Sequence, residues 1–161
     1  MMADENNICQ DLTILSDFLK KNLKNKTVVY TYGAWDIVHP GHIKFLRRAK
    51  ALGDFLIVGT VSDKPIRNLK GPDRPTQSQY DRAVVVSSFG FVDLGILQSD
   101  YDPSFELNEL ERVDLLTKGD DWEYIPGQET IESLGGKLIK LGYSEEYSTS
   151  KIINQINKKD D

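Results

Sequence analysis

The sequence of 161 residues predicts an α/β fold, in which a parallel sheet is flanked by helices on both faces. Segments rich in apolar and β-branched residues alternate along the chain with segments whose apolar residues recur at helical spacing. The segment 54–61 is an almost continuous apolar run, which is typical of a strand buried on both faces of a parallel sheet. Such alternation favours right-handed strand–helix–strand crossovers.

The first half of the chain begins with a polar segment, 1–10, that we expect to be disordered. Residues 11–24 place apolar side chains at helical spacing and lysines in the last turns, where cations interact favourably with the helix dipole. A strand is expected at 27–31, a helix up to residue 52 and a second strand at 54–61. The segment 62–76 contains three prolines and four cations, and we expect a long functional loop there.

The second half repeats the alternation. Helices are expected at 77–89, 104–110, 128–134 and 151–157, and strands at 91–97, 113–117 and 137–141. The elements together predict a Rossmann-like sheet of five parallel strands, in a single domain over 11–157 followed by a tail at 158–161. Ligands of such sheets bind beyond the carboxyl ends of the strands, where several polar clusters of this sequence fall.

Composition narrows the functional class. Hydrophobic residues make up 39% and charged residues 28% of the chain, as in globular proteins. The net charge of −5 argues against broad nucleic-acid binding, and the single cysteine, Cys9, excludes an internal disulfide framework. The polar start does not resemble a secretory signal, and no apolar run reaches the length that crosses a membrane. We therefore expect a cytoplasmic protein without nucleic-acid or membrane partners.

The stretch 27–46 organises the rest of the chain, because a strand there runs through a glycine-containing turn into a helix. His39 and His42 flank Pro40 and Gly41 at the start of that helix. Free backbone N–H groups and the helix dipole make such a start an anion site, and two imidazoles add further donors. The pattern predicts a phosphate pocket. A zinc site is not expected, because no cysteine or carboxylate lies at a ligand spacing.

The order of these motifs resembles the cytidylyltransferase-like nucleotidyltransferases. The similarity begins at a strand end followed by a His-x-Gly-His motif, in Thr31-Tyr32-Gly33-Ala34-Trp35-Asp36 and His39-Pro40-Gly41-His42. A second family motif, close to Ile-Ser-Thr-Thr, is matched by Tyr147-Ser148-Thr149-Ser150 before the last helix. The resemblance covers residues 27–156.

Two branches of this family are similar to different segments. Segments 69–75, 113–119 and 135–136 resemble the heptose-1-phosphate adenylyltransferase domain, whereas 31–33 and 119–123 resemble glycerol-3-phosphate cytidylyltransferase. Trp35 stands in place of the usual Phe, Ser150 in place of Thr, and the cytidylyltransferase's arginine before the second motif is replaced within 144–146. The resemblance implies transfer of NMP from an NTP to a phosphorylated sugar or polyol, with ATP and a heptose-1-phosphate-like acceptor favoured. The alternatives are CTP with glycerol 3-phosphate, giving CDP-glycerol, and a non-catalytic nucleotide-binding module.

The resemblance also implies a site. It assigns catalysis to His39, His42, Lys70 and Arg82. It assigns nucleotide binding to Thr31, Tyr32, Gly33, Ala34, Trp35, Gly41, Gly119, Asp120, Tyr147, Ser148, Thr149 and Ser150. Acceptor binding falls to Asp36, Lys64, Asp121 and Trp122. No residue is assigned to a metal, and Mg²⁺ is expected to arrive with the NTP.

Several of these residues also have a structural interpretation. Trp35 suits the core, Trp122 either the core or a stacking platform, and Arg82 a charge on a helix surface. Asp36 is a candidate for orienting a neighbouring loop. The Ser-Thr-Ser segment is at minimum an N-cap, which uses the same N–H groups as a phosphate site. A homodimer is expected from the family resemblance and from the apolar face of helix 11–24.

Overall fold

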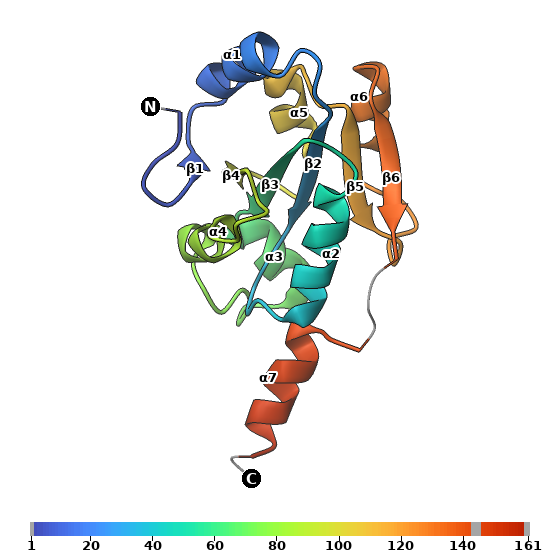
Figure 1. Cartoon of the computed structure of the whole chain (residues 1–161). Coiled ribbons are helices and arrows are strands. Elements are labelled where there is room, and N and C mark those ends of the chain that lie inside the picture. The colour runs from blue at the N-terminus through green and yellow to red at the C-terminus, as the bar shows by residue number, and fades with distance from the viewer. Residues whose placement is uncertain (1, 143–145, 160–161) are drawn as a thin grey trace.

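The computed structural model describes residues 2–142 and 146–159, and within them the strands form a single parallel sheet (Figure 1). The strands are β1 (Ile8–Cys9), β2 (Val28–Gly33), β3 (Phe55–Val61), β4 (Leu94–Gln98), β5 (Leu115–Gly119) and β6 (Lys137–Leu141). Their order across the sheet is β1-β4-β3-β2-β5-β6. The chain therefore runs outward from β2 in one direction and then returns to add β5 on its other side.

Helices cover both faces of this sheet. They are α1 (Leu12–Asn22), α2 (Pro40–Lys50), α3 (Asp63–Lys70), α4 (Gln79–Ser87), α5 (Ser104–Leu110), α6 (Gln128–Ser133) and α7 (Thr149–Asn157). One buried cluster joins α1, α5 and α6 to the sheet, and a second joins α2 and α4 to the opposite face. The α/β fold expected from the sequence is confirmed.

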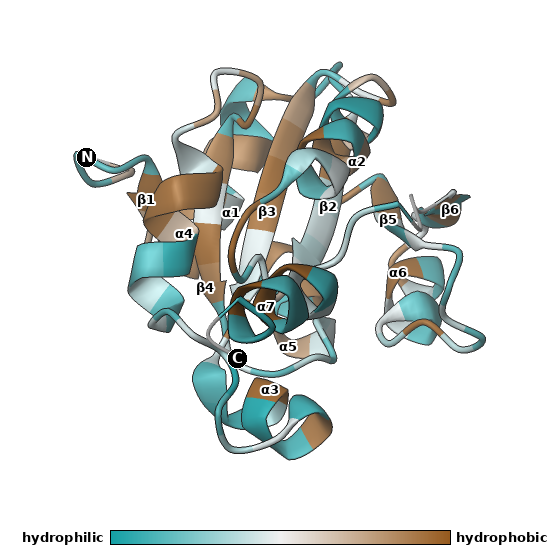
Figure 2. Ribbon diagram, turned by 90° about the horizontal axis from the view of Figure 1, so that it is seen from below, coloured by the Kyte–Doolittle hydropathy of each residue, from teal (hydrophilic) through white to brown (hydrophobic). Residues whose placement is uncertain are grey.

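The strand β2 contributes side chains to the hydrophobic clusters on both faces of the sheet. Tyr30 belongs to the cluster under α1 and α5, whereas its neighbour Val29 belongs to the cluster under α2, because successive side chains of a strand point to opposite faces. All six residues of β2 are buried. Figure 2 shows the hydrophobic colour along β3, the neighbour of β2 in the sheet, and along β4 beyond it.

The sheet has six strands rather than the predicted five, and the first strand lies inside the segment 1–10, for which disorder is expected. Ile8 and Cys9 pair in parallel with β4 and are both 1% exposed. The Asp4 carboxylate accepts hydrogen bonds from the backbone N–H groups of Asn6 and Ile8, which turns the chain toward the sheet edge. A strand of two residues is too short to produce a periodic pattern, so no sequence signal marks it.

The segment 62–76 is not the continuous loop expected from its prolines. Helix α3 occupies residues 63–70 and is anchored by the fully buried Ile66. Pro65 lies in the first turn of the helix, where its missing N–H group would have had no partner. A loop remains only at 71–76.

Helix α1 uses its apolar face inside the chain. Leu15 and Leu19 are fully buried, in the same cluster as Leu107 and Leu110 of α5. The face that suggested a dimer contact is therefore covered by the chain's own helix. The family resemblance is left as the basis for expecting a homodimer.

The strand order creates a crevice between β2 and β5. From these neighbouring strands the connections lead in opposite directions, to β3 and to β6, so their carboxyl ends open a gap between the loops. Helix α7 lies beyond the carboxyl ends of the strands (Figure 1). This arrangement defines where a ligand has room to bind.

Candidate active site

A pocket of about 250 Å³ opens at this crevice. Its walls come from the loop after β2, the first turns of α2 and α7, the end of α3 with the loop that follows, and the residues after β4 and β5. These segments are far apart in the sequence. The fold brings them together at the switch point that the strand order predicts.

The end of β2 and the loop after it form one wall through Gly33, Ala34, Trp35 and Asp36. Trp35 has a positive φ of 53°, and its indole Nε1 donates to the backbone oxygen of Gly59 at 2.9 Å. A Cβ on Gly33 would lie 3.1 Å from the indole, so this position favours glycine. At 5% exposure Trp35 is a core residue, as its alternative interpretation proposed, and it still lines the pocket.

The two histidines are held at the start of α2 by a reciprocal cap. The Nδ1 atom of His39 accepts a hydrogen bond from the N–H of Gly41 at 3.1 Å, and Nδ1 of His42 accepts from the N–H of His39 at 3.3 Å. In a neutral imidazole whose Nδ1 accepts, the proton resides on Nε2. Both rings therefore carry an Nε2–H donor, and they stack with centroids 3.8 Å apart.

Both imidazoles are neutral at physiological pH. Burial lowers the pKa of His39, and burial, followed by the neighbouring His39, lowers the pKa of His42 to about 3. His42 lines the pocket, whereas His39 lies behind it with an Nε2 atom that has no partner among the described residues. The pocket thus presents a neutral hydrogen-bond donor from His42 rather than an imidazolium.

The depressed pKa of His42 predicts an effect of pH on stability. Between pH 6.5 and 3 the unfolded chain binds a proton at this position that the native chain does not, so acid favours unfolding. At pH 5 this contribution amounts to about 2 kcal/mol relative to pH 7. Urea denaturation at both pH values measures it, with His42→Gln as the non-titrating reference. An equal loss of stability in both proteins between pH 7 and 5 would contradict the neutral buried imidazole.

The first turn of α7 closes the pocket opposite α2. The Ser148 hydroxyl oxygen caps this helix by accepting from the N–H of Lys151 at 3.1 Å. The Thr149 hydroxyl donates to the backbone oxygen of Asp36 at 2.6 Å, which ties α7 to the loop after β2. The N-cap expected of the Ser-Thr-Ser segment is present, and the two helix starts face one pocket.

Cationic side chains gather on the remaining walls. Lys118, at the end of β5, donates to the backbone oxygen of Tyr32 at 2.8 Å, and its ammonium lies 4.1 Å from the centroid of that ring. Burial lowers the pKa of Lys118 to about 7. Burial, and next the charge of Arg74, also lowers the pKa of Lys70. An anionic ligand would relieve this crowding of positive charge.

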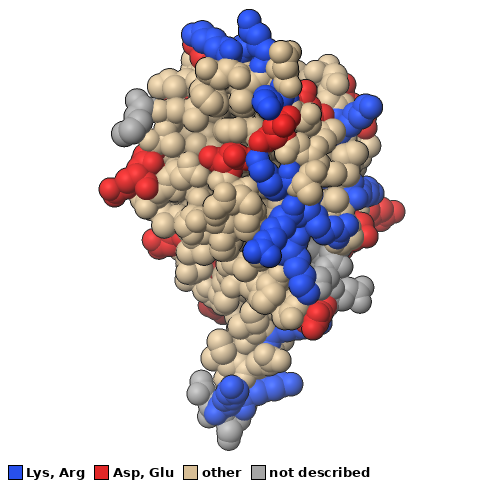
Figure 3. All heavy atoms as spheres, viewed as in Figure 1, with Lys and Arg blue, Asp and Glu red and all other residues tan. Residues whose placement is uncertain are grey.

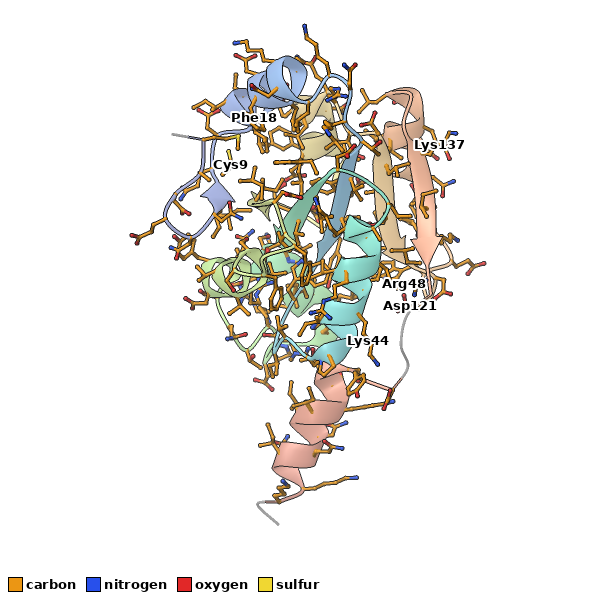
Figure 4. The ribbon with its side chains drawn as sticks, viewed as in Figure 1. Cys9, Phe18, Lys44, Arg48, Asp121 and Lys137 are labelled. Carbon is orange, nitrogen blue, oxygen red and sulfur yellow. The ribbon has the colours of Figure 1, made fainter. Side chains whose placement is uncertain are left out.

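Aromatic and acidic side chains complete the opening. The rings of Tyr101 and Trp122 lie with centroids 5.9 Å apart at an angle of 41°, and both line the pocket with Asp121. Figure 4 shows Asp121 near the carboxyl end of β6 and Lys44 on α2. This side of the pocket has the mixture of flat apolar faces and polar groups that suits a nucleoside or sugar.

Basic residues on the outer face of α2 hold that helix in place. Figure 3 shows Lys and Arg side chains gathered over α2. Lys50 pairs with Asp93 at 2.6 Å, and Arg48 donates to the backbone oxygen of Gly142 at 2.6 Å. These contacts fix α2, and with it His42, against its neighbours.

Comparison with known proteins agrees with this geometry. Residues 30–155 match the family described as cytidylyltransferase-like. The chain belongs to this family. The expected class of enzyme, a nucleotidyltransferase, is thereby confirmed.

Among individual relatives, this chain is similar to proteins named HldE. "Bifunctional protein HldE" of Syntrophotalea carbinolica is 39% identical over 83% of this chain and 27% of the relative, and the HldE of Campylobacter jejuni serotype O:6 is 41% identical over 90% and 30%. The chain therefore spans less than a third of the length of these relatives.

Solved structures share the fold. The lipopolysaccharide core biosynthesis protein from Thermoplasma volcanium is 30% identical with a TM-score of 0.65, and the match covers 75% of this chain and all of that one. A pantoate-β-alanine ligase from Francisella tularensis has a TM-score of 0.62 at 14% identity, over 94% of this chain and 77% of that one. The second similarity concerns the fold alone.

The structure does not bring Arg82 to the pocket. Its side chain is fully buried, and the guanidinium donates to the backbone oxygens of Gln77, Ala34 and Val61 and to the Asp63 carboxylate. The phosphate contact expected of Arg82 is therefore not available in this arrangement, and its position is not a helix surface either. Through these hydrogen bonds, Arg82 connects the loop after β2 with the end of β3 and with the starts of α3 and α4.

Asp36 orients a neighbouring loop, which was one of its two expected roles. Its carboxylate accepts from the backbone N–H groups of Thr76 and Gln77, from the Thr76 hydroxyl and from Arg74 Nε. The side chain is only 1% exposed, although the residue borders the pocket. Its oxygens are occupied by the protein and leave little capacity for an acceptor.

Other residues expected in the site lie around the pocket without lining it. They are Thr31, whose hydroxyl donates to the Thr117 oxygen; Gly41, packed against the His39 ring; Tyr147, which stacks on His39; Asp120; and the exposed Lys64. A Cβ on Gly41 would lie 2.9 Å from His39 Nδ1 and 3.2 Å from Tyr147 Cβ, so glycine leaves room for the His39 ring and for the loop before α7. The sequence places Arg74 in the expected functional loop and Lys118 in a polar cluster at a strand end, but neither is assigned to the site from sequence, and Tyr101 is not marked; all three line the pocket.

Two further kinds of feature are absent from the described residues. No described helix combines the length and apolar character that crossing a membrane requires. The described side chains include no group of three or more His, Cys, Asp or Glu placed to hold a metal ion.

Proposed function

We propose that this chain transfers the nucleoside monophosphate of an NTP to a phosphorylated sugar, releasing pyrophosphate. The observation that carries the proposal is the convergence of the His42 donor, the start of α7 and the cations Lys70 and Lys118 on one pocket. ATP and a heptose-1-phosphate-like acceptor are favoured, because segments 69–75 and 113–119 resemble that branch and the curated relatives are HldE proteins.

The reaction needs no covalent enzyme intermediate. An oxygen of the acceptor phosphate attacks the α-phosphorus, the bond from the α-phosphorus to the bridging oxygen breaks, and its electron pair leaves with pyrophosphate. The protein positions the reactants and stabilises the developing charge, and such preorganised electrostatics supply much of the rate enhancement of many enzymes. The Nε2–H of His42 donates to a phosphate oxygen, and His39 positions the His42 ring by stacking and through its backbone N–H.

The triphosphate extends from α2 toward α7. Backbone N–H groups in the first turn of α7 and the hydroxyl of Ser150 face the β- and γ-phosphates, since a helix start attracts anions. Lys70, at the end of α3, also lines this pocket and adds a positive charge. The nucleoside and the acceptor share the side lined by Gly119, Asp121 and Trp122.

Mg²⁺ would be bound mainly by the nucleotide. Among the described residues that line the pocket, the carboxylates are Asp36 and Asp121, and Asp36 already accepts hydrogen bonds from its own loop. This donor set fits a metal that keeps triphosphate oxygens and water as its ligands, with Asp121 as the nearby carboxylate. The ion would neutralise charge on the phosphates.

A matrix of four NTPs against phosphorylated sugars and polyols, read by pyrophosphate release, tests the proposal. We expect the highest rate with ATP and an aldose 1-phosphate such as a heptose 1-phosphate. Highest activity with CTP and glycerol 3-phosphate would instead support the cytidylyltransferase alternative, which the resemblance of 119–123 favours. Nucleotide binding without pyrophosphate release for any pair would contradict an enzymatic role.

A homodimer is proposed from the family resemblance. Sedimentation equilibrium at micromolar concentrations should give about twice the chain mass of 18.2 kDa. A monomer at these concentrations would contradict the proposed assembly.

A further inference from the structure

We infer that Arg74 is a further residue that binds the leaving pyrophosphate during nucleotidyl transfer, an inference that rests on the function proposed above. Arg74 lies in the loop after α3 and lines the pocket, with a side chain only 12% exposed. Its guanidinium is held from two directions. Nε donates to the Asp36 carboxylate at 3.2 Å, and Nη1 donates to the Ser150 hydroxyl at 3.3 Å.

The third nitrogen of this guanidinium has no acceptor within the part of the chain that the structure describes. Nη2 of Arg74 is shielded from solvent and makes no hydrogen bond to any described residue. A buried donor without a partner is unfavourable, and an anionic oxygen is its strongest complement. Arg82 is the instructive contrast, because its Nε and both of its Nη atoms donate to protein acceptors. Of these two arginines, Arg74 is the one with an unused donor nitrogen among the described residues, and it is also the one that lines the pocket.

The contact with Ser150 places Arg74 beside the β- and γ-phosphates rather than the acceptor. Ser150 lies in the first turn of α7, where free N–H groups attract the end of the triphosphate. Lys70 is the neighbouring cation, since the charge of Arg74 is a cause of the lowered pKa of Lys70. Two positive charges and a helix start therefore meet in one pocket.

The chemistry of the transfer gives this placement a catalytic consequence. As the bond between the α-phosphorus and the bridging oxygen breaks, its electron pair moves onto pyrophosphate, whose negative charge increases. A planar guanidinium donates two parallel hydrogen bonds to such a group, which an ammonium cannot reproduce. The Asp36 carboxylate and the Ser150 hydroxyl preset the plane of Arg74, so little reorganisation is needed at the moment of bond cleavage.

The test compares Arg74→Lys with the wild type and with Arg47→Lys, a control on the outer face of α2 where the guanidinium lies over Phe91. Calorimetric titration with inorganic pyrophosphate and Mg²⁺ should show at least tenfold weaker binding to Arg74→Lys. With the best substrate pair, kcat should fall at least tenfold while the KM for the acceptor changes less than threefold. Arg47→Lys should match the wild type within twofold in every measurement.

The experiment distinguishes failure of the inference about Arg74 from failure of the proposed function. Wild-type affinity for pyrophosphate in folded Arg74→Lys overturns the inference about Arg74, as does a change confined to the KM of the acceptor. Absence of pyrophosphate release by the wild type with every substrate pair overturns the proposed function instead. If Arg74→Lys does not fold, Arg74→Gln, which keeps a donor for Asp36, replaces it in the same titration and faces the same criterion.

Discussion

Replacing His42 with alanine is expected to lower the turnover number by about 10²- to 10³-fold, the usual cost of removing one preorganised donor from a developing oxyanion. The Nε2–H of His42 is the imidazole donor that lines the pocket, and its ring is fixed by the cap to His39 and by stacking on it. Pyrophosphate release under saturating substrates measures the effect. Unchanged turnover in the alanine variant would defeat the mechanism.

The control for this variant separates chemistry from folding. Alanine also removes the acceptor of the His39 N–H, and the loss of such a cap costs about 1 kcal/mol of stability. Both the alanine and the glutamine variants should therefore retain the far-ultraviolet circular dichroism of the wild type. Because glutamine keeps a terminal N–H group, His42→Gln should retain more activity than His42→Ala. Equal turnover numbers of the two variants would show that catalysis does not depend on a hydrogen-bond donor at this position.

Replacing Arg82 with methionine is expected to destabilise the fold by about 3–5 kcal/mol, because it removes the partner of several buried groups at once. The backbone oxygens of Ala34 and Val61 would be left without their donor, and Asp63 would lose its ion pair at 2.6 Å. Urea denaturation followed by circular dichroism measures the change. Arg82→Lys should also lose stability, because one ammonium cannot reach acceptors in this many directions.

The same variants decide between the two roles considered for Arg82. If the residue is structural, activity per folded molecule should stay within a few-fold of the wild type. A variant with the stability of the wild type and a greatly weakened affinity for NTP would restore the phosphate-binding role expected from the sequence. Arg112→Lys serves as a matched control, because this less buried arginine also donates to three backbone oxygens, those of Leu19, Lys24 and Lys26.

The contrast between Arg74 and Arg82 shows why site residues are harder to predict than elements. Both arginines lie in the segment between β3 and β4, and nothing in their immediate neighbours in sequence marks which of them faces a ligand. The order of the family's residues favours Arg82. Its actual partners are backbone oxygens from three separate segments, which no local pattern encodes.

Short or singly anchored elements escape prediction for a related reason. The strand β1 has two residues, and the buried residue of α3 is Ile66, so neither produces the repeated apolar spacing on which prediction depends. Both are held by long-range contacts, β1 by pairing with β4 and α3 partly through the ion pair of Asp63 with Arg82. By contrast, each of the five strands from β2 onward is expected from its apolar run.

Local sequence patterns were sufficient to predict the parallel α/β architecture, the helix start at His39 and His42, and the capped start of α7, because each depends on residues close together in the chain. Which cations share the pocket could be known only from the folded chain. Lys118 comes from the end of β5 and Arg74 from the loop after α3, and they meet, with Tyr101 from the loop after β4, because β5 returns to the opposite side of β2 from β3. Side-chain direction at such a junction depends on packing across the sheet, which the linear pattern does not contain.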